Sequence, residues 1–405
     1  MSEERRPKIG VFGCWRGTML AACLKLAGAD IVAVCDRDPK QLEKIKPYIS
    51  EGAGVYEDFE EFILHDMDAC VLANYYCEHQ RYAIRLLAKG ISVLSECASN
   101  CTMAEGVELV RAVEAAEKLG AKYMLIENYP YSAPCQEMRR VYQSGILGRA
   151  VHGEGEYIHP MSTAERLRYA PTPEHWRNHI PPTYYNTHSV GPIMYATEAM
   201  PLYISAQAVE RPEVGVGTYA RNDPYAQMTC KMSDGSVFSF CGWGAVGAHG
   251  SWYRIVCTEG DVETVRFDGS RIRVGFNSYN TPEGSPRDSV YAPTFPYDGD
   301  KAAKCGHSGG DYYVCREFVE VLLGKREPFF DVYRATAMAS CGILGWRSCL
   351  ENGRMYEIPD FRREEDRVKY ENDTASPFVM SDGTVDIQCS LEPDRNIRTP
   401  ENDMK

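Results

Sequence analysis

The first third of the chain alternates short apolar runs with stretches of helical periodicity, and this alternation limits the possible folds more than any other feature. Apolar runs that we expect to be strands occupy residues 9–12, 31–35, 69–73, 92–95 and 123–126. Helical patterns accompany them from about residue 18, from residue 39, across residues 82–87 and over residues 103–119. Strands that alternate with helices are typical of βαβ units. We therefore predict a doubly wound, parallel α/β domain over residues 1–125.

Beyond residue 126 the pattern changes to a period of two, which is typical of half-buried strands. After a helix predicted at residues 135–144, strand patterns occupy residues 151–158, 203–209, 225–232, 237–241, 253–257, 261–267 and 271–275. Turn formers at residues 233–236 and 268–270 separate neighbouring strands, which indicates antiparallel pairing. We therefore predict an α+β domain over residues 126–360 with a large, mostly antiparallel open sheet.

Less regular segments complete the second half of the chain. Residues 277–304 are rich in Pro, Ser, Tyr and Gly and predict a long surface loop. Helices are expected at residues 312–323 and 332–350. Residues 361–405 carry charge and turn formers with little apolar periodicity, so we expect a C-terminal tail that frays or wraps a partner subunit.

The composition is that of an ordinary globular protein, with 44% apolar and 25% charged residues. The net charge of -13 disfavours a nucleic-acid partner, because that affinity comes from clustered Lys and Arg. No segment approaches the ~20 apolar residues of a membrane span, and the N-terminus lacks the apolar core of an export signal. Sixteen scattered cysteines without zinc-site spacing predict free thiols. We therefore expect a cytoplasmic protein that contacts no membrane.

A glycine-rich turn follows the first predicted strand. Gly10, Gly13 and Gly17 stand where a strand passes into a helix, and a Cβ atom there would block the close approach of a pyrophosphate to backbone N–H groups. Trp15 stands near the place of the second glycine of the usual pattern. Asp36, about twenty residues further on at the end of the second strand, can accept hydrogen bonds from both ribose hydroxyls of NAD.

The glycine turn and this carboxylate together predict a dinucleotide-binding Rossmann domain, and we add Arg16 of the same turn to the expected cofactor contacts. Arg37 beside Asp36 can tolerate a 2′-phosphate, so NADP stays open as an alternative to NAD. The domain resembles that of the glucose-fructose oxidoreductase, inositol dehydrogenase and MocA superfamily, and the resemblance extends over about residues 8–361. In that superfamily a Glu-Lys-Pro motif supplies a lysine for proton transfer, whereas residues 96–98 here are Glu-Cys-Ala. The usual proton acceptor of an alcohol dehydrogenase is therefore missing.

A closer resemblance is carried by a series of motifs further along the chain. In order and approximate spacing they are similar to the corresponding runs of glycoside hydrolase family 109, which also lacks the lysine. The motifs lie at residues 123–131 (YMLIENYPY), 145–148 (GILG), 152–159 (HGEGEYIH), 176–177 (WR), 185–192 (YNTHSVGP), 307–312 (HSGGDY) and 357–361 (EIPDF).

This resemblance implies a redox-neutral glycosidase that holds NAD tightly and regenerates it in every cycle. In the implied mechanism the sugar 3-hydroxyl is oxidised, a base removes the acidified C2 proton, the C1 substituent leaves, water adds, and the hydride returns to C3. Tyr157 matches the proposed base, and His188 matches a position near the 3-hydroxyl. Arg177 and Tyr185 match sugar contacts. The positions that match NAD contacts are Asn74, His79, Glu96 and Asn128.

His159 joins the expected catalytic residues because of its place in the sequence. It stands two residues after Tyr157 and shares its predicted strand face, and two polar aromatic rings on one face favour a pocket over ordinary strand packing. A tyrosine base has an ordinary pKa near 10, so it requires a cation or donor that favours the phenolate. His159 or Arg177 can supply one.

Two further residues are expected on the substrate side. His307 precedes Ser-Gly-Gly-Asp at a predicted helix start, where exposed N–H groups attract anions or sugar oxygens. Asp311 ends that tetrapeptide. A metal site made of His152, His159 and His188 is not predicted, because no carboxylate stands at metal-binding spacing beside them.

Two other functions stay open. One is a conventional NAD(P)-dependent sugar or inositol dehydrogenase that releases NADH, and the other is a non-catalytic sugar or cofactor sensor on the same fold. We expect a small carbohydrate or glycoside as the ligand. By analogy with related proteins, which pair their open sheet faces, we also expect a homodimer or homotetramer.

Overall fold

The computed structural model describes residues 5–210, 215–380, 382–392 and 399–400. The chain divides into two compact units. The first consists of residues 1–100, 104–133 and 294–336, and the second of residues 101–103, 134–293 and 337–405. The segment 294–336 therefore belongs with the N-terminal residues, although its sequence stands far beyond the predicted boundary at residue 125.

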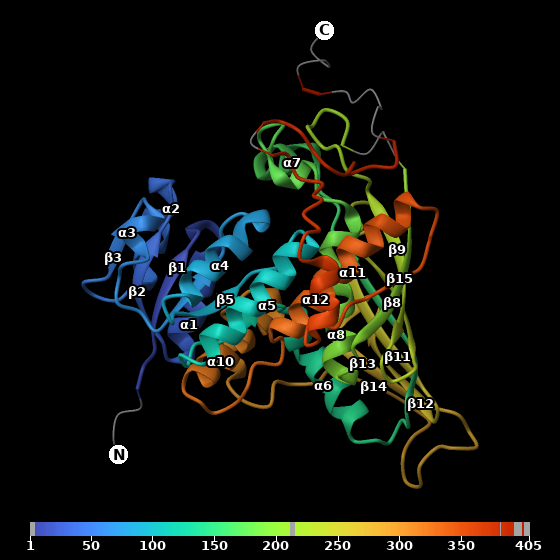
Figure 1. The fold of residues 1–405 in the computed structure, drawn as a ribbon. Helices are drawn as coiled ribbons and strands as arrows, with labels where there is room; N and C mark the ends of the chain where they lie inside the picture. The colour runs from blue at the N-terminus through green and yellow to red at the C-terminus, as the bar shows by residue number, and fades with distance from the viewer. Residues whose placement is uncertain (1–4, 211–214, 381, 393–398, 401–405) are drawn as a thin grey trace. The chain divides into compact units, whose positions relative to one another are not determined.

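The first unit contains a six-stranded parallel sheet with the spatial order β3-β2-β1-β4-β5-β6 (Figure 1). Its strands are β1 (Lys8–Phe12), β2 (Asp30–Cys35), β3 (Gly54–Tyr56), β4 (Ala69–Leu72), β5 (Ser92–Ser95) and β6 (Tyr123–Leu125). The predicted doubly wound parallel sheet is confirmed, and the five expected strands are present. Strand β3 was not expected, because three residues are too few to show a period.

Local signals set the ends of the helices in the first unit. Helix α1 begins at Cys14, earlier than the expected start near residue 18, and ends where Gly28 adopts a left-handed φ of +102°. Asp38 begins α2 by accepting a hydrogen bond from the Lys40 N–H group. The helices are α1 (Cys14–Ala27), α2 (Pro39–Ile45), α3 (Phe59–Phe62), α4 (His79–Leu87), α5 (Met103–Glu117), α9 (Gly299–Ala302) and α10 (Gly310–Leu322). Helix α10 packs against α1, which is why residues 294–336 belong to this unit.

The second unit contains a nine-stranded sheet with the order β14-β13-β12-β11-β7-β10-β9-β8-β15 (Figure 1). Only the described pair β7 and β10 is parallel, so the predicted large, mostly antiparallel sheet is confirmed. The strands are β7 (Ala150–Ile158), β8 (Pro201–Val209), β9 (Tyr225–Met232), β10 (Val237–Cys241), β11 (Gly250–Cys257), β12 (Gly260–Val265), β13 (Asp268–Phe276), β14 (Asp288–Tyr291) and β15 (Tyr356–Glu357).

Two local predictions in this unit were wrong. The turn expected at residues 268–270 lies at residues 266–267 instead, because Val265 already pairs with Asp268 across β12 and β13. The expected loop 277–304 contains strand β14, which pairs with β13, as well as helix α9. Strand β14 was not predicted because an edge strand forms by pairing with its neighbour, and its own sequence shows no clear periodicity.

The helices of the second unit include one in the C-terminal tail. They are α6 (Ala133–Gln143), α7 (Thr163–Tyr169), α8 (Thr187–Thr197), α11 (Val332–Leu350) and α12 (Glu364–Tyr370). Arg347 of α11 makes a bidentate pair with Asp373 at 2.6 and 2.7 Å, and Trp346 Nε1 donates to Gln388 O at 2.7 Å. The described part of the tail therefore packs on its own unit. Among the helices in the described part of the chain, none combines the length and apolar character that a membrane crossing requires.

Two glycines of β7 let helix α8 lie directly on the second sheet. A Cβ on Gly155 would lie 2.0 Å from Ser189 O, and a Cβ on Gly153 would lie 2.8 Å from Ile193 Cγ2. Both distances are shorter than any real carbon contact. Because α8 begins just beyond this crossing, its first turn is held close to the carboxyl end of β7.

We expect Gly155→Ala to destabilise the protein by about 1–3 kcal/mol or more, because the added methyl group must push α8 off the sheet. Gly269→Ala is the matched control, since Gly269 is also a strand residue and a Cβ there would meet nothing within 4 Å. The midpoint of urea unfolding measures the difference. Equal midpoints for the two variants would contradict the packing argument.

Candidate active site

Gly13 forms the turn between β1 and α1 in the first unit. Its φ of +92° lies in the left-handed region, and a Cβ there would lie 2.4 Å from the carbonyl carbon of Ala73. The N-terminus of α1 therefore lies against the carboxyl end of β4. No side chain caps this helix, and its first turn holds no acidic residue. A helix N-terminus of this kind suits a phosphate group.

The other two glycines of the segment act in packing. A Cβ on Gly10 would lie 2.5 Å from Met67 Sδ, and a Cβ on Gly17 would lie 2.5 Å from Val11 Cγ1. These glycines therefore bring the helix, the strand and their neighbours together. Their expected contact with a cofactor stays a prediction.

Asp36 lies just beyond β2, and backbone N–H groups fix its carboxylate. Oδ2 accepts a hydrogen bond from Cys14 N at 2.6 Å, and Oδ1 accepts one from Asp38 N at 2.9 Å. Since Cys14 is the first residue of α1, Asp36 is held beside the start of that helix. A carboxylate has about four acceptor sites, so both oxygens keep capacity for hydroxyl donors. Arg37 is exposed at the same edge.

Arg16 joins distant segments of the first unit through its guanidinium group. Its Nε donates to Glu96 Oε1 at 2.7 Å, and Nη1 and Nη2 donate to the two oxygens of Asp311 at 2.9 and 2.6 Å. The buried Asp311 carboxylate also accepts from Asn128 Nδ2 at 3.1 Å. His307 Nδ1 lies 3.0 Å from Oδ2 of the same carboxylate. We call these five side chains the Arg16 cluster.

The charges of the Arg16 cluster are matched. Burial alone would raise the pKa of Asp311, but hydrogen bonds from His307 and Arg16 outweigh it and hold that pKa far below its usual range. Burial likewise opposes the charge on Arg16, while Glu96 and Asp311 keep its pKa well above the usual range. Asp311 therefore anchors Arg16, and His307 is more exposed than Arg16, Glu96 or Asp311. The substrate contacts expected of both residues stay predictions.

Asn74 and His79 lie where β4 passes towards α4. His79 is buried, with Nδ1 3.2 Å from Ala98 O and Nε2 3.3 Å from Asn74 O. Burial lowers the pKa of His79, so its ring is neutral at neutral pH. The Oδ1 atoms of Asn74 and Asn128 are buried without a hydrogen-bond partner in the described residues. Such orphaned acceptors fit a bound ligand with N–H or O–H donors, and together with the glycine turn they fit a dinucleotide.

Four predicted residues form one cluster of rings in the second unit, which we call the ring cluster. The His188 ring stands edge-on to Tyr157, with 4.8 Å between ring centroids. Tyr185, at the end of η5 (Pro182–Tyr185), stacks at 6.1 Å from Tyr157 and edge-on at 5.1 Å from His188. His159 lies 5.9 Å from Tyr157. The cluster therefore joins the end of β7 to the start of α8.

Residues of neighbouring strands fix the backbone of the ring cluster. Tyr157 N donates to Cys241 Sγ at 3.0 Å, and the Tyr253 hydroxyl donates to His188 O at 2.8 Å. Cys241 and Tyr253 could not be predicted as partners, because strand alternation shows which face a residue occupies but not which strand lies beside it. These contacts fix the backbone from which the rings of Tyr157 and His188 project.

His159 is a neutral imidazole at neutral pH. Burial lowers its pKa, and His249 and Arg177 lower it further. The His249 ring lies 4.8 Å from it, and Trp243 Nε1 donates to its carbonyl oxygen at 3.1 Å. Of the two residues expected to favour a phenolate at Tyr157, only Arg177 therefore carries a full positive charge.

Aromatic rings hold Arg177 in place. It lies in η4 (Trp176–Asn178), with Cζ 4.4 Å from the ring centroid of Trp176 and 5.9 Å from that of Tyr169. Its Nε is buried without a hydrogen-bond partner among the described residues. The guanidinium is thus positioned by stacking, and donors remain for a ligand.

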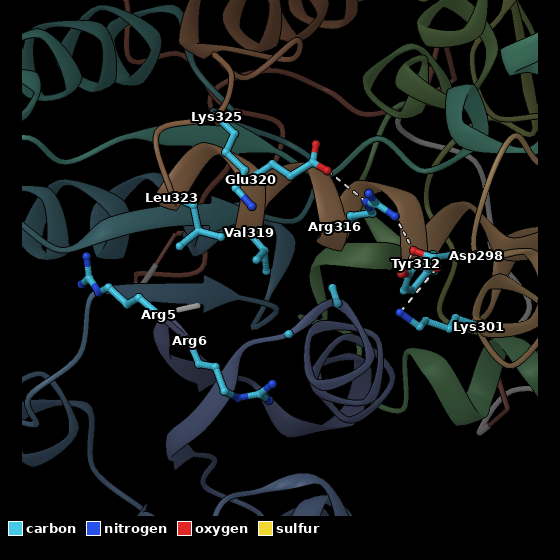
Figure 2. Close-up of a pocket in the computed structure, with 12 residues that line it drawn as sticks. Arg5, Arg6, Asp298, Lys301, Tyr312, Arg316, Val319, Glu320, Leu323 and Lys325 are labelled. Atoms are coloured by element: carbon cyan, nitrogen blue, oxygen red, sulfur yellow. Dashed lines mark hydrogen bonds and ion pairs between the residues drawn. The ribbon is translucent and has the colours of Figure 1, made fainter. Parts of the chain in front are cut away.

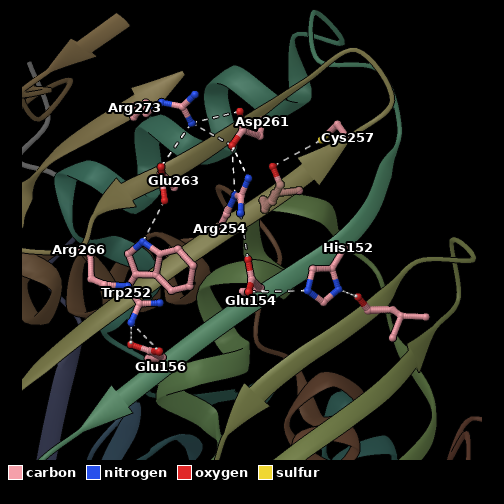
Figure 3. Close-up of polar contacts among 12 residues, drawn as sticks. His152, Glu154, Glu156, Trp252, Arg254, Cys257, Asp261, Glu263, Arg266 and Arg273 are labelled. Atoms are coloured by element: carbon pink, nitrogen blue, oxygen red, sulfur yellow. Dashed lines mark hydrogen bonds and ion pairs between the residues drawn. The ribbon is translucent and has the colours of Figure 1, made fainter. Parts of the chain in front are cut away.

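The opposite face of the second sheet carries charged pairs (Figure 3). Side chains alternate along β7, so His152 and Glu156 point away from the ring cluster, and Glu156 pairs with Arg266 at 2.8 Å. His152 therefore cannot share a site with His159 and His188. Within the described ranges, no group of three or more His, Cys, Asp and Glu side chains is placed to hold a metal ion.

A surface pocket of about 290 Å³ lies at the other end of the first sheet (Figure 2). Its lining includes Arg6, which precedes β1, and Gly28, which follows α1, so it borders the amino end of β1. Arg316 in this pocket is already paired with Asp298 and, at 3.0 Å, with Glu320. Because ligands of open α/β sheets bind outside the carboxyl ends of the strands, we do not assign the cofactor to this pocket.

Two family models match parts of the chain, and the second match spans both units. Residues 8–125 match the family model of the oxidoreductase family with NAD-binding Rossmann fold. Residues 291–367 match the model of the glycosyl hydrolase 109 C-terminal domain.

Relatives by sequence include the alpha-N-acetylgalactosaminidase of Tannerella forsythia, which is 23% identical over 402 residues, with 84% of this chain and 82% of the relative covered. A glycosyl hydrolase family 109 protein of Streptomyces niveus is 25% identical over 401 residues, with 89% and 79% covered. Among solved structures, levoglucosan dehydrogenase in complex with NADH and levoglucosan has a TM-score of 0.72 at 13% identity, with 88% of this chain and 100% of that chain covered. At that identity the likeness shows the fold.

These matches confirm the resemblance that the sequence motifs predict. The protein is an enzyme of the glucose-fructose oxidoreductase, inositol dehydrogenase and MocA type, with an NAD-binding Rossmann domain. Within that class, its sequence relatives and its C-terminal family match are those of glycosyl hydrolase 109.

We expect Asp311→Asn to lower the free energy of unfolding by about 3–5 kcal/mol at pH 7, because it leaves the buried charge of Arg16 partly uncompensated. The folded pKa of Asp311 lies below its unfolded value, so the stabilisation is present above about pH 4 and is lost as the pH falls through the folded pKa. The difference between the two proteins, measured by urea unfolding, should be constant between about pH 5 and 7 and shrink below about pH 4.

The control for this measurement is Asp300→Asn, since Asp300 is an exposed aspartate of the same unit. Its effect should stay within about 0.5 kcal/mol at every pH. A similar loss in both variants would show that the Arg16 cluster is not a special source of stability.

Proposed function

We propose that this NAD-dependent, sugar-active enzyme oxidises the C3 hydroxyl of a sugar transiently and cleaves the glycosidic bond by elimination and water addition. The observation that carries the proposal is the ring cluster, in which the phenol of Tyr157 and the imidazole of His188 stand edge-on with centroids 4.8 Å apart. Two groups that exchange protons, held side by side, suit a reaction that moves protons at neighbouring carbon atoms.

Tyr157 is the base that removes the C2 proton in this proposal. A phenol with a pKa near 10 acts as a base only where donors or a positive charge favour the phenolate. Arg177 supplies positive charge, and the rings of His159 and His188 offer N–H donors. Burial of Tyr157 strengthens each of these interactions by excluding water.

His188 takes the proton of the 3-hydroxyl. The residues at 96–98 offer no lysine for this step, and Glu96 is engaged by Arg16 at 2.7 Å. His188 is buried, its backbone carbonyl accepts a hydrogen bond from the Tyr253 hydroxyl, and its ring packs edge-on against Tyr157 and Tyr185. An imidazole accepts and returns a proton near neutral pH without a change of partner.

The first unit holds the cofactor in this proposal. The start of α1 binds the pyrophosphate, Asp36 binds the ribose, and the orphaned Oδ1 atoms of Asn74 and Asn128 accept from donors of the dinucleotide. When bound, NAD supplies a hydride acceptor at C3 that later returns the hydride. Tight retention follows from a redox-neutral cycle, because the same cofactor molecule is needed for both steps.

The location and assembly of the enzyme are also part of the proposal. No disulfide joins the cysteines of the described residues, which suits the reducing cytoplasm. The outer face of the second sheet, which carries His152, Glu154 and Glu156 of β7, is the surface that we propose for pairing with a second copy in a homodimer or homotetramer.

Incubation of aryl glycosides with catalytic NAD in deuterated water tests the reaction. We expect aglycone release with deuterium at C2 and no net NADH. Stoichiometric NADH without aglycone would instead establish a conventional dehydrogenase, and binding without either product would establish a sensor.

We expect Tyr157→Phe to lower kcat by about 10²- to 10⁴-fold and to leave NAD binding unchanged, because it removes only the proton-transferring hydroxyl. Tyr203→Phe is the control, since Tyr203 is an exposed tyrosine of β8. Aglycone release measures kcat, and calorimetry measures the affinity for NAD. A variant Tyr157→Phe that is as active as Tyr203→Phe would exclude Tyr157 as the base.

We expect Asp36→Ala to weaken NAD binding by about 10- to 100-fold, because the variant loses the hydrogen bonds from the ribose hydroxyls to a charged carboxylate. The affinity for NADP should not fall with it, because removal of the carboxylate also removes its repulsion of a 2′-phosphate. Glu43→Ala, an exposed carboxylate of α2, is the control. Calorimetric titration with both dinucleotides distinguishes the outcomes, and equal losses for NAD and NADP would refute the assignment of Asp36 to the ribose.

A further inference from the structure

Arg166 of helix α7 is a buried arginine without a counter-charge. Only 7% of its surface is exposed, and its Nη2 is buried without a hydrogen-bond partner. Among the described residues, no carboxylate forms an ion pair with it. Burial lowers the pKa of Arg166. Arginine is almost never fully buried unless it is paired, so this residue departs from a general rule.

The partly buried Arg16 and the buried Arg367 obey that rule. Arg16 binds Glu96 and Asp311, and Arg367 donates to Phe361 O at 2.6 Å and lies 3.3 Å from Glu364. An uncompensated buried charge costs several kcal/mol of stability. Residues that break a local rule in this way are expected at functional positions.

Trp243 connects Arg166 with the ring cluster. The Arg166 Cζ atom lies 5.7 Å from the Trp243 ring centroid. Trp243 Nε1 donates to His159 O at 3.1 Å, and Trp243 N donates to Pro182 O at 2.7 Å. Trp243 therefore bridges the end of β7 and the start of η5, the two elements that carry Tyr157 and Tyr185. Arg166 borders the proposed sugar site through this one ring.

The segment around Arg166 is positively charged in an otherwise acidic chain. Residues 159–179 contain three arginines and two glutamates, and burial lowers the pKa of each of their three histidines, so the segment carries a small positive charge, whereas the whole chain has a net charge of -13. One of the glutamates, Glu165, already accepts hydrogen bonds from Ser162 N and Oγ at 2.9 and 2.8 Å. Arg177 in the same segment has its own buried, unpartnered Nε. Two guanidinium groups thus keep unused donors beside the same site.

We propose that Arg166, together with Arg177, forms a subsite for an anionic group of the sugar, so that the substrate is an acidic glycoside. The planar fork of a guanidinium matches the two oxygens of a carboxylate, and it also binds sulfate or phosphate esters. A uronic acid, a sugar sulfate and a sugar phosphate share this chemistry. The inference rests on the proposed function and specifies the substrate class of the same site.

Calorimetric titration of the NAD-saturated, full-length protein tests the subsite. The probes are glucuronate, galacturonate, glucose 6-sulfate and glucose 6-phosphate, with glucose and galactose as neutral references. We expect at least one anionic sugar to bind about 10- to 100-fold more tightly than its neutral reference, as hydrogen bonds to charged groups require. The tightest anionic probe then distinguishes a carboxylate from a sulfate or phosphate ester.

Two variants of helix α7 test whether Arg166 causes the preference for anionic sugars. Arg166→Gln should abolish the preference for the anionic sugar and leave the affinity for the neutral sugar within a few-fold. Arg168→Gln, an exposed arginine of the same helix, should keep the preference. Absence of any preference in the wild type, or equal losses in both variants, overturns the proposal.

The midpoint of thermal unfolding without sugar distinguishes a ligand-binding arginine from a structural one, because the two roles predict opposite effects of replacing Arg166. Removal of an uncompensated buried charge should leave the midpoint of Arg166→Met unchanged or raise it, whereas a structural arginine would lower it on replacement. Cleavage assays then separate the two proposals. If anionic sugars bind preferentially but no aryl glycoside of the preferred anionic sugar is cleaved, the glycosidase function fails and the subsite stands. If neutral aryl glycosides are cleaved as efficiently as those of the preferred anionic sugar, the function stands and the subsite is overturned.

Discussion

The close approach of helix α8 to strand β7 is the constraint on which the chemistry of the second unit depends. Gly153 and Gly155 leave no room for a side chain beneath the helix, so α8 rests on the sheet backbone and its first turn meets the end of the strand. Strand alternation then brings Tyr157 to the helix side of the sheet, and the helix start brings His188 beside it. Two missing side chains thus set the distance between the groups that we assign to proton transfer.

In the first unit, ion pairs hold the start of helix α1 in place. Arg16 is surrounded by partners that match its charge, so the start of α1 is held rigidly beside Asp311 and Glu96. Arg166 lacks such partners among the described residues, so no ion pair there offsets the free energy lost when its guanidinium is removed from water. The contrast separates a guanidinium that stabilises the protein from one that is kept ready for a ligand.

Much of this architecture could be predicted because periodicity is a local signal. Both sheets follow from apolar runs and alternation, and the motifs around Tyr157 and His188 predicted that these residues belong to one site. Short strands such as β3 and β15 show no period, and the exposed Phe267 made a turn look like a strand. The pairing of Arg16 with Asp311 could not be predicted, because side chains that meet across the fold leave no pattern in the sequence. Arg166 stands two residues before Arg168 in a short helix, and nothing in that stretch of sequence distinguishes the buried arginine from the exposed one.

The Arg16 cluster also has a consequence for the order in which the protein can be made. The first unit needs residues 294–336, so the residues up to 133 leave the ribosome with Arg16 and Glu96 in place but without Asp311. At typical rates of synthesis, on the order of ten to forty seconds pass before residue 311 is added. Most of the strands of the second unit are synthesised in that interval. The nascent chain therefore completes its dinucleotide-binding unit only after most of the sugar-binding unit exists, and a ribosome that stalls early releases no finished Rossmann unit.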